Sequence, residues 1–422
     1  MNEQVRAAAV EVSQTARPAR SAAVAFIFIT ILLDMLALGL IMPILPKLVE
    51  SFVNNDTARA ARIFGLFGTA WALMQLIFSP ILGSLSDRFG RRPVVLLSNF
   101  GLGLDYVLMA MAPSLIWLFV GRIISGVTSA SVSTAFAYIA DITPAERRAA
   151  VFGKVGAAFG AGFILGPALG GLLGNLDPRL PFWAAAGLSF ANTLYGLSIL
   201  PESLPRDRRS PFRWKSANPI GAIRLLRSDP VLAGLSVVNF FAQLSHAVLP
   251  STFVLYATYR YGWDAKTVGL TLAMVGVGAM VVQGVAIGPI VNRLGERRAL
   301  ILGLVCGALG FLIFGTAPSG PISWLGIPVM ALWGVSGAAL QALNSRRVKP
   351  EQQGQLQGAT GSVQSVSQLL GPFLFTLTFA YFISAQAPVH LPGAPFLLAA
   401  ALLLLALAVA VRTLLRVPSP ST

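Results

Sequence analysis

Cysteine, histidine and acidic residues are scarce in this chain of 422 residues. A single cysteine, Cys306, excludes an intramolecular disulfide and any metal cluster held by cysteines. The two histidines, His246 and His390, are too few to build a histidine metal site. The chain contains no glycine-rich phosphate loop with its lysine, so ATP is not the expected energy source. We therefore expect no enzyme activity, no resident metal and no cofactor.

Charged residues are also few, at 11%, whereas hydrophobic residues make up 55% of the chain. The mean hydropathy of +0.73 is typical of a protein that crosses a membrane several times. A helix of about 20 residues spans the roughly 30 Å of hydrocarbon in a bilayer. Twelve apolar stretches approach this length, and their expected limits are 22–45, 63–82, 94–112, 115–140, 151–173, 182–200, 231–257, 267–288, 299–317, 323–344, 356–383 and 393–412. The composition and these stretches predict an all-α membrane protein with twelve transmembrane helices.

The excess of basic residues, which gives a net charge of +15, is unevenly distributed along the chain. Of the 31 lysines and arginines, 24 lie in the two tails and in the connections between stretches 2 and 3, 4 and 5, 6 and 7, 8 and 9, and 10 and 11. The opposite connections hold six, and Arg122 lies within a stretch. By the positive-inside rule, this asymmetry predicts an inner-membrane protein with both termini in the cytosol. The charge thus indicates orientation in a lipid bilayer and not a nucleic-acid partner.

An internal repeat divides the chain into two halves. The run GSLSDRFGRR, Gly83–Arg92, recurs 205 positions later in a degenerate form as GPIVNRLGER, Gly288–Arg297. The same shift places Pro167 on Pro372, and duplicated halves are common in membrane transporters. We expect a cytosolic tail at 1–21, an N-terminal six-helix bundle at 22–200, a cytosolic linker at 201–230, a C-terminal six-helix bundle at 231–412 and a second cytosolic tail at 413–422.

The repeated run combines a tight connection with a fixed charge. Gly83 and Gly90 are expected to bracket a turn, because glycine adopts positive φ without steric cost. Asp87 lies between them and can accept hydrogen bonds from the exposed amides at a helix N-terminus. The basic residues of the run can bind carboxylates or lipid phosphates, and they are Arg88, Arg91 and Arg92. The alternative is that these arginines only fix the topology.

Three charged residues lie inside the apolar stretches, where each costs free energy and tends to face a cavity or a partner. They are Asp34, Asp105 and Arg122. Burial disfavours the charged form of a carboxyl group, which makes Asp34 the candidate proton carrier. Arg122 stays protonated and needs a fixed partner or an anionic step, and Asp105 is either that partner or a second coupling residue.

The apolar stretches of the second half contain no acidic residue, so we expect the protonation switch in the first half. Those stretches instead offer polar side chains that are uncharged at neutral pH, with His246 as the one residue that could take up a proton. The candidate substrate contacts of the second half are Asn239, Gln243, His246 and Gln341.

The run GSLSDRFGRRP, Gly83–Pro93, resembles the loop signature of the major facilitator superfamily. The run GAAFGAGFILGPALGG, Gly156–Gly171, is similar to the antiporter motif of its drug-efflux branch, with Gly162, Gly166, Pro167 and Gly170 as the motif residues. Small residues also allow ordinary close helix packing. The resemblance implies two pseudo-symmetric six-helix bundles around a cavity that opens alternately to either side. It also implies a cytosolic gate in which Asp141 pairs with Arg91, formed by Gly83, Asp87, Arg88, Gly90, Arg91, Arg92 and Asp141.

A closer resemblance, to the tetracycline/proton antiporter group, extends over most of the chain. It rests on the runs LDMLALGLIMPILP (Leu33–Pro46), ALMQLIFSPILGSLSDRFGRRP (Ala72–Pro93), LDYVLMAM (Leu104–Met111), GRIISGVTSAS (Gly121–Ser131) and GQLQG (Gly354–Gly358). This resemblance implies proton-coupled efflux of small amphipathic drugs by a monomer, with tetracycline-like compounds as the leading expectation. It also implies a substrate contact at Gln75, although such a glutamine equally serves as a link between helices.

One position departs from the resembled group, whose members export the drug as a chelate with a divalent metal and carry an aspartate in the ninth stretch. Alignment on GERRALILG, Gly295–Gly303, places Gly307 at that position. Glycine cannot balance a cationic chelate, so we expect export with weak or no dependence on divalent metal. The alternatives are a metabolite or sugar exporter of the same fold and a non-transporting membrane receptor or scaffold.

Overall fold

The computed structural model describes residues 27–128, 131–143, 145–209, 226, 229–349 and 352–415. The expected tail at 1–21 lies outside them, as do most residues of the expected linker at 201–230 and tail at 413–422. Within the described residues the chain is helical and has no β-strand. The prediction of an all-α protein is confirmed.

The helices coincide with the predicted stretches. The first half consists of the helix at residues 27–41, α2 (Leu45–Ser51), α3 (Thr57–Phe89), α4 (Arg91–Met111), α5 (Leu115–Thr128), α6 (Ser131–Ile142), α7 (Ala145–Leu176), α8 (Leu180–Ile199) and the 3-10 turn η1 (Arg206–Arg208). The second half consists of α10 (Pro230–His246), α11 (Val248–Tyr261), α12 (Ala265–Val281), the π-helical turn η3 (Val282–Ala286), α13 (Ile287–Thr316), α14 (Gly320–Trp324), α15 (Gly326–Ala331), α16 (Gly334–Ser345), α17 (Gln353–Phe382) and α18 (Ala394–Leu415).

Nine described helical segments are long and apolar enough to cross a membrane. One of them, Ala265–Thr316, contains two predicted stretches, 267–288 and 299–317, and the chain turns between them at Gly295. The fourth predicted stretch is divided between α5 and α6. Lipid tails offer no hydrogen-bond partner to the backbone, and a helix satisfies its backbone amides and carbonyls within its own segment. The chain is therefore a multi-pass membrane protein.

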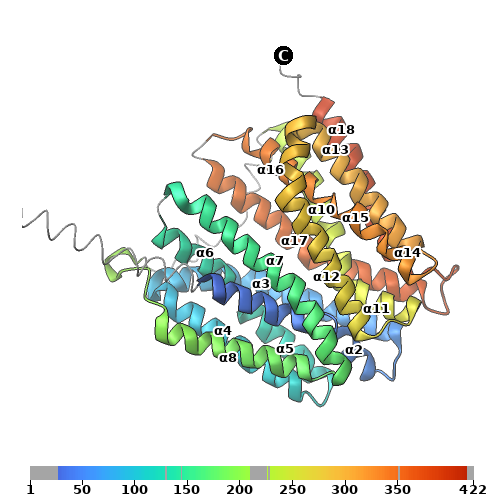
Figure 1. Ribbon diagram of the computed structural model, residues 1–422, viewed down its shortest axis with the longest axis horizontal. Coiled ribbons are helices and arrows are strands. Elements are labelled where there is room, and N and C mark those ends of the chain that lie inside the picture. Colours follow the sequence, from blue (N-terminus) through green and yellow to red (C-terminus); the bar gives the residue numbers. More distant parts are fainter. Residues whose placement is uncertain are drawn as a thin grey trace, which may run out of the picture.

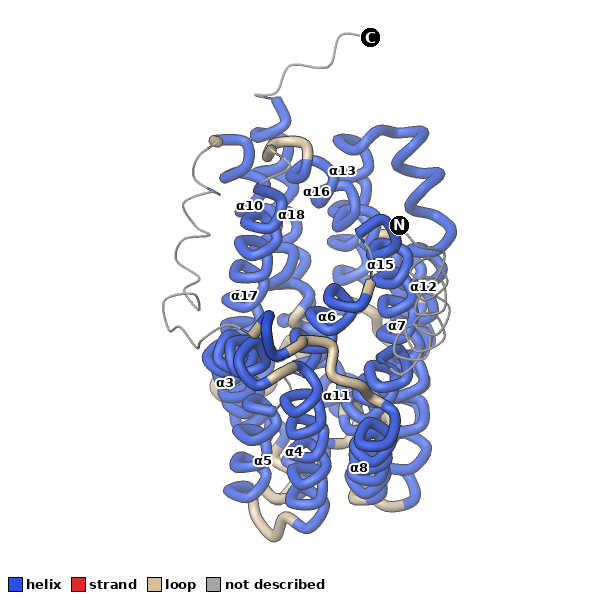
Figure 2. The backbone as a smooth tube through the Cα atoms, turned by 90° about the vertical axis from the view of Figure 1, so that its left-hand side faces the viewer, coloured by secondary structure: helices blue, strands red, loops and turns tan. Residues whose placement is uncertain are grey.

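The helices form two bundles that follow the two halves of the chain. Figure 1 shows the first half, coloured blue to green, at one end and the second half, coloured yellow to red, at the other. In Figure 2 the helices α4, α5 and α8 of the first bundle lie below α10, α13 and α18 of the second. This arrangement is the predicted pair of six-helix bundles.

The connection at the repeated run differs in one respect from the prediction. Gly90 separates α3 from α4 at a positive φ of 107°, and its copy Gly295 turns within α13 at a φ of 73°. Gly83, however, lies inside α3, so it does not bracket a turn. One glycine per copy is enough to turn the chain, because α4 starts directly after Gly90 and the positive φ of Gly90 changes the direction of the backbone there.

Aspartates cap the N-termini of some of the helices. Asp56 accepts a hydrogen bond from the amide of Arg59 at the start of α3, and Asp264 accepts one from the amide of Thr267 at the start of α12. The side-chain and backbone hydrogen bonds from Thr267 lower the pKa of the Asp264 carboxyl. Such caps satisfy amides that have no partner in the first turn of a helix.

The two halves meet through two helix pairs, α7 with α12 and α3 with α17. The 205-residue shift carries α3 onto α12 and α7 onto α17, so these pairs are copies of each other. A Cβ on Gly269 of α12 would collide with the carbonyl oxygen of Pro167 on α7. In the second pair, a Cβ on Gly65 would collide with the hydroxyl of Thr376. Glycine at both crossings lets the helix backbones approach closely.

The halves are close together on one side of the molecule and apart on the other. We call the end that carries Gly90 and Gly295 the motif side, and the opposite end the far side. On the far side, Lys47 Nζ of the first half donates a hydrogen bond to the carbonyl oxygen of Trp263 in the second, at 3.1 Å. On the motif side, no described atom outside the neighbouring backbone of the same helix lies within 4 Å of where a Cβ on Gly83, Gly288 or Gly358 would stand. The protein is therefore closed on the far side.

The crossing at Gly269 yields a stability prediction. We expect Gly269→Ala to destabilise the fold by about 1–3 kcal/mol, because the new methyl group overpacks against α7. The matched change Gly288→Ala meets nothing within 4 Å and should stabilise its helix by up to about 1 kcal/mol. Thermal unfolding of the detergent-solubilised variants measures both effects. Equal midpoints for the two variants would contradict the proposed backbone contact.

Candidate functional site

Asp34 lies in a buried pair with an asparagine from the sixth predicted stretch. The Nδ2 of Asn192, on α8, donates a hydrogen bond to Asp34 Oδ1 at 3.1 Å and another to the Thr30 carbonyl oxygen at 3.2 Å. Asp34 is 8% exposed and Asn192 is fully buried. Asn192 was not among the predicted site residues, because a single asparagine in an apolar helix gives no signal until its partner is known. The carboxyl group of Asp34 is thus held in a fixed position.

Asp105 and Arg122 form a second buried group in the same bundle. Asp105 of α4 is fully buried, close enough to Arg122 of α5 for their charges to attract. No ion pair within 4 Å joins these two among the described residues, so Arg122 is not in direct contact with the partner suggested for it. The Arg122 guanidinium instead lies over the Trp71 ring, 5.3 Å from its centre. Tyr106, next to Asp105 in the chain, lies near enough to Asp34 and Arg122 for their charges to act on it.

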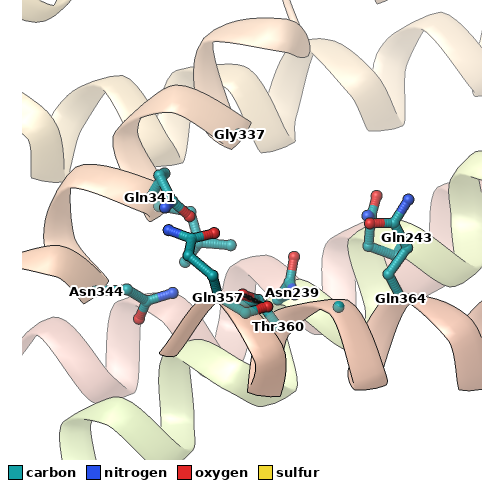
Figure 3. A pocket seen from close by; sticks show the side chains of 10 residues that line it. Asn239, Gln243, Gly337, Gln341, Asn344, Gln357, Thr360 and Gln364 are labelled. Carbon is teal, nitrogen blue, oxygen red and sulfur yellow. Dashed lines mark hydrogen bonds between the residues drawn. The ribbon is translucent and has the colours of Figure 1, made fainter. Parts of the chain in front are cut away.

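A polar cavity of about 240 Å³ lies in the second half, near the motif side. Helices α10, α16 and α17 line it, and Figure 3 shows their carboxamide side chains around it. The polar residues that line it are Asn239, Gln243, Gln341, Asn344, Gln357, Thr360 and Gln364. Three predicted substrate contacts, Asn239, Gln243 and Gln341, therefore come together. We call this group the carboxamide pocket.

Two predicted substrate contacts lie elsewhere. Gln75 of α3 and His246 of α10 are not among the residues that line the carboxamide pocket. The His246 ring packs beside that of Trp333, with 5.7 Å between their centres. Gln357 and Thr360 were not predicted, although their spacing with Gln364 places all three on one face of a helix and was a usable signal.

Arg91 is the centre of a charged network on the motif side. Its Nη1 lies 2.6 Å from Asp87 Oδ1 and its Nε lies 3.1 Å from Asp141 Oδ2. The Arg91–Asp141 pair that the resemblance implied is thus present. Nη1 also donates a hydrogen bond to Ser86 Oγ at 2.6 Å, and Ser203 donates one to Asp141 at 3.1 Å. The network joins α3, α4 and α6 with the chain that follows α8.

Glu202 belongs to the same network but was not predicted. Its Oε1 accepts hydrogen bonds from the amide of Arg91 at 2.8 Å and from the amide of Leu204 at 3.1 Å. A carboxylate at the start of α4 satisfies an amide without an intrahelical partner and is favoured by the helix dipole. A Cβ on Gly90 would collide with Glu202, which is a second reason for glycine there. The other arginines of the run lie nearby, Arg92 donating to the Leu197 carbonyl oxygen and Arg88 over the Phe89 ring.

The glycines of the second resembled motif lie against the first helix. A Cβ on Gly162 would stand 2.6 Å from Met35 Cβ, and one on Gly166 would stand 2.6 Å from Gly39 Cα. Gly170 is packed in the same way against Leu40. Pro167 has its ring near Gly39 of the first helix and its carbonyl oxygen near Gly269 of α12. Helix α7 therefore touches the first helix with one face and the second bundle with another.

In the part of the chain that the structure describes, no group of three or more His, Cys, Asp or Glu could hold a metal ion.

The two helix crossings are related by the repeat, and each has a glycine at the point of contact. The family model of the Major Facilitator Superfamily matches residues 27–372 and 235–422. The chain belongs to the major facilitator superfamily. This membership confirms the predicted family and fold, and the superfamily points to transport rather than catalysis.

Relatives of this major facilitator protein include several tetracycline resistance proteins. The class C protein of Escherichia coli is 40% identical over 354 residues, which cover 83% of this chain and 88% of that protein. The class D protein of Salmonella ordonez is 37% identical over 392 residues, 92% of this chain and 96% of that protein. The identity extends over most of both chains, so the chain falls in the group of tetracycline resistance proteins.

Solved structures of other transporters share the fold. A bacterial homologue of the human lysosomal transporter Spinster, in an inward-facing and unoccupied conformation, matches with a TM-score of 0.76 at 17% identity. The match covers 96% of this chain and 99% of that one. The nucleoside transporter NupG matches with a TM-score of 0.76 at 12% identity, over 93% of this chain and 99% of the other. At such identities the likeness concerns the fold alone.

The network around Arg91 gives a prediction for this major facilitator protein. Asp87→Asn removes a charge without changing shape, and we expect normal expression with transport slowed about 10- to 100-fold, the effect of losing one charge-assisted hydrogen bond. Transport rates in membrane vesicles, normalised to protein content, measure the change. Asp207→Asn, an exposed carboxylate in η1, is the matched control and should have no effect. Equal rates for both variants would remove Asp87 from the gate.

Proposed function

We propose that this protein exports tetracycline-type compounds across the inner membrane in exchange for protons. The observation that carries the proposal is the division of polar groups between the bundles. A buried carboxyl held by Asn192 lies in one half, and an uncharged polar cavity lies in the other. Identity of 40% to the class C tetracycline resistance protein supports the choice of substrate.

The basic residues orient the protein in the membrane. The motif side carries the arginine-rich connections, so we assign it to the cytosol together with both termini. The conformation described, closed on the far side, then admits substrate from the cytosol. Efflux requires the reverse, with the motif side closed and the far side open. Asp87, whose side chain is 47% exposed, is free to accept hydrogen bonds from the second bundle when the motif side closes.

Asp34 is the group to which we assign the coupling proton. The hydrogen bond from Asn192 positions one carboxyl oxygen, while the second oxygen can take up or release a proton. Tyr106 lies within reach of the charges of Asp34, Asp105 and Arg122, so the three charged groups share one region of the first bundle. Each proton that enters down a potential of 100 mV supplies about 2.3 kcal/mol, and the cycle then needs no cofactor. A monomer contains all of these groups.

A metabolite or sugar exporter is the alternative that one observation favours. The carboxamide pocket has no charged lining residue and suits hydroxyl groups as well as the polar edge of a drug. A receptor or scaffold has no use for buried charges such as Asp34 and Arg122, which cost free energy in a membrane.

The coupling role of Asp34 can be tested by one isosteric change. Asp34→Asn keeps the shape and an acceptor for Asn192 but cannot titrate. We expect it to abolish substrate-induced proton release and uphill efflux, while exchange of labelled for unlabelled substrate continues, because exchange moves no net proton. Proteoliposomes with an imposed pH gradient measure all three, and Asp207→Asn is the control. Undiminished uphill efflux by Asp34→Asn would move the proton site to another residue.

The substrate assignment leads to a prediction about divalent metal. Gly307 is packed against Trp333 and Leu403, so the second half has no carboxylate at this position to balance a cationic chelate. We expect proteoliposomes to accumulate tetracycline at nearly equal rates with magnesium and with a chelator. Strict dependence on magnesium would show that another residue balances the chelate. Transport of sugars but not of tetracycline under both conditions would favour the alternative exporter.

A further inference from the structure

We propose that the carboxamide pocket is a subsite for an uncharged edge of the substrate that carries both hydrogen-bond donors and acceptors, such as neighbouring amide, enol and hydroxyl groups. This inference rests on the proposed function and specifies which part of the substrate the second half holds.

Three helices contribute to the pocket from different parts of the second half. Asn239 and Gln243 are one turn apart on α10, and Gln357 and Gln364 are two turns apart on α17. Gln341 of α16 completes the ring of side chains in Figure 3. Long side chains on facing helices can adjust to a ligand, whereas the helices themselves fix the position of the site.

One atom of the pocket lacks a partner within the protein. Asn344 is 1% exposed, and its buried Oδ1 accepts no hydrogen bond from any described residue. A buried acceptor without a donor costs about 1–3 kcal/mol. This oxygen is closed off from the cavity, so the contacts to a ligand come from the other side chains of the pocket. Among the described residues, the side chains of Gln341 and Gln364 also make no hydrogen bond with one another or with a neighbour. The pocket therefore offers donors and acceptors that a ligand can use.

The lining determines the charge of the group that fits. Among the described residues no Asp, Glu, Lys, Arg or His lines the pocket, and a carboxamide offers both donors and acceptors but no counter-charge. The charges that follow α16 in the chain are already paired, Arg346 with Glu296 at 2.7 Å and Arg347 with Asp229 at 3.7 Å. A charged group placed here would lose its hydration without gaining an ion pair. A neutral polar edge loses less and recovers its hydrogen bonds.

The volume shows that the pocket holds only part of a drug. Sites for drug-sized ligands usually measure about 300–1,000 Å³. The cavity of about 240 Å³ lies below that range. A multi-ring substrate must therefore place one edge here and extend the rest toward the first bundle, where the buried charges lie. Binding of the neutral edge and transfer of the proton are thereby assigned to different halves.

Equilibrium binding of tetracycline to the detergent-purified full chain tests this subsite. Gln341 and Gln364 are exposed, so their replacement by leucine should preserve the fold. We expect Gln341→Leu and Gln364→Leu each to weaken binding roughly 2- to 12-fold, the effect of one neutral hydrogen bond, and the double variant to weaken it further. Gln386→Leu, in the exposed connection between α17 and α18, is the matched control and should bind like the unmodified protein.

A charge-adding variant separates a neutral occupant from a cationic one. Gln364→Glu should weaken binding because its carboxylate removes the amide donors. Tighter binding by this variant would overturn the inference, since it would place a cation in the pocket. Unchanged binding by the double leucine variant, or no binding of tetracycline by the unmodified protein, would also overturn it.

Uphill transport measured on the same preparations distinguishes the inference from the proposed function. If the leucine variants lose tetracycline binding but the unmodified protein does not transport tetracycline, the subsite is supported and the proposed function is refuted. If the double variant binds and transports tetracycline like the unmodified protein, the proposed function is supported and the subsite is refuted.

Discussion

The close contact of α7 with α12 at Gly269 is the feature on which the arrangement of the two bundles depends. Lipid tails are as apolar as leucine, so helices in a membrane associate through close packing rather than through the hydrophobic effect. Only a position without a side chain lets the backbone of α12 reach Pro167. The same helix α7 presents Gly166 to Gly39 on another face. Helix α7 is therefore tightly packed on both faces, against the first helix and against the second bundle.

The two halves carry copies of the same run but have different polar contents. The buried charges lie in the first half, and the carboxamides line a cavity in the second. Charges in a low-dielectric interior act over longer distances than hydrogen bonds do, so Asp105 and Arg122 attract each other without direct contact. Carboxamides act only on groups that touch them. This difference suits one half to handling protons and the other to recognising a shape.

The two copies of the repeated run have kept the backbone and changed the electrostatics. Gly90 and Gly295 both have positive φ. In the first copy, Glu202 accepts from the amide of Arg91 at the start of α4, whereas in the second copy Glu296 pairs with Arg346. Backbone reversal depends on a local property of glycine, and the charged partners depend on which distant segment folds over it. The motif side can therefore have unequal networks on its two bundles.

The sequence by itself determined the membrane helices, the two bundles and the turn at Gly90, because each depends on hydropathy or on the conformation of one short segment. It also indicated the Arg91–Asp141 pair, but only through resemblance to a family. The tertiary structure decided that Asn192 binds Asp34, that Glu202 binds the start of α4, and that Gln357 and Thr360 join Asn239 in one pocket while His246 does not. These contacts join residues far apart in the chain, and which helices become neighbours is settled by packing at glycine crossings that no local pattern specifies.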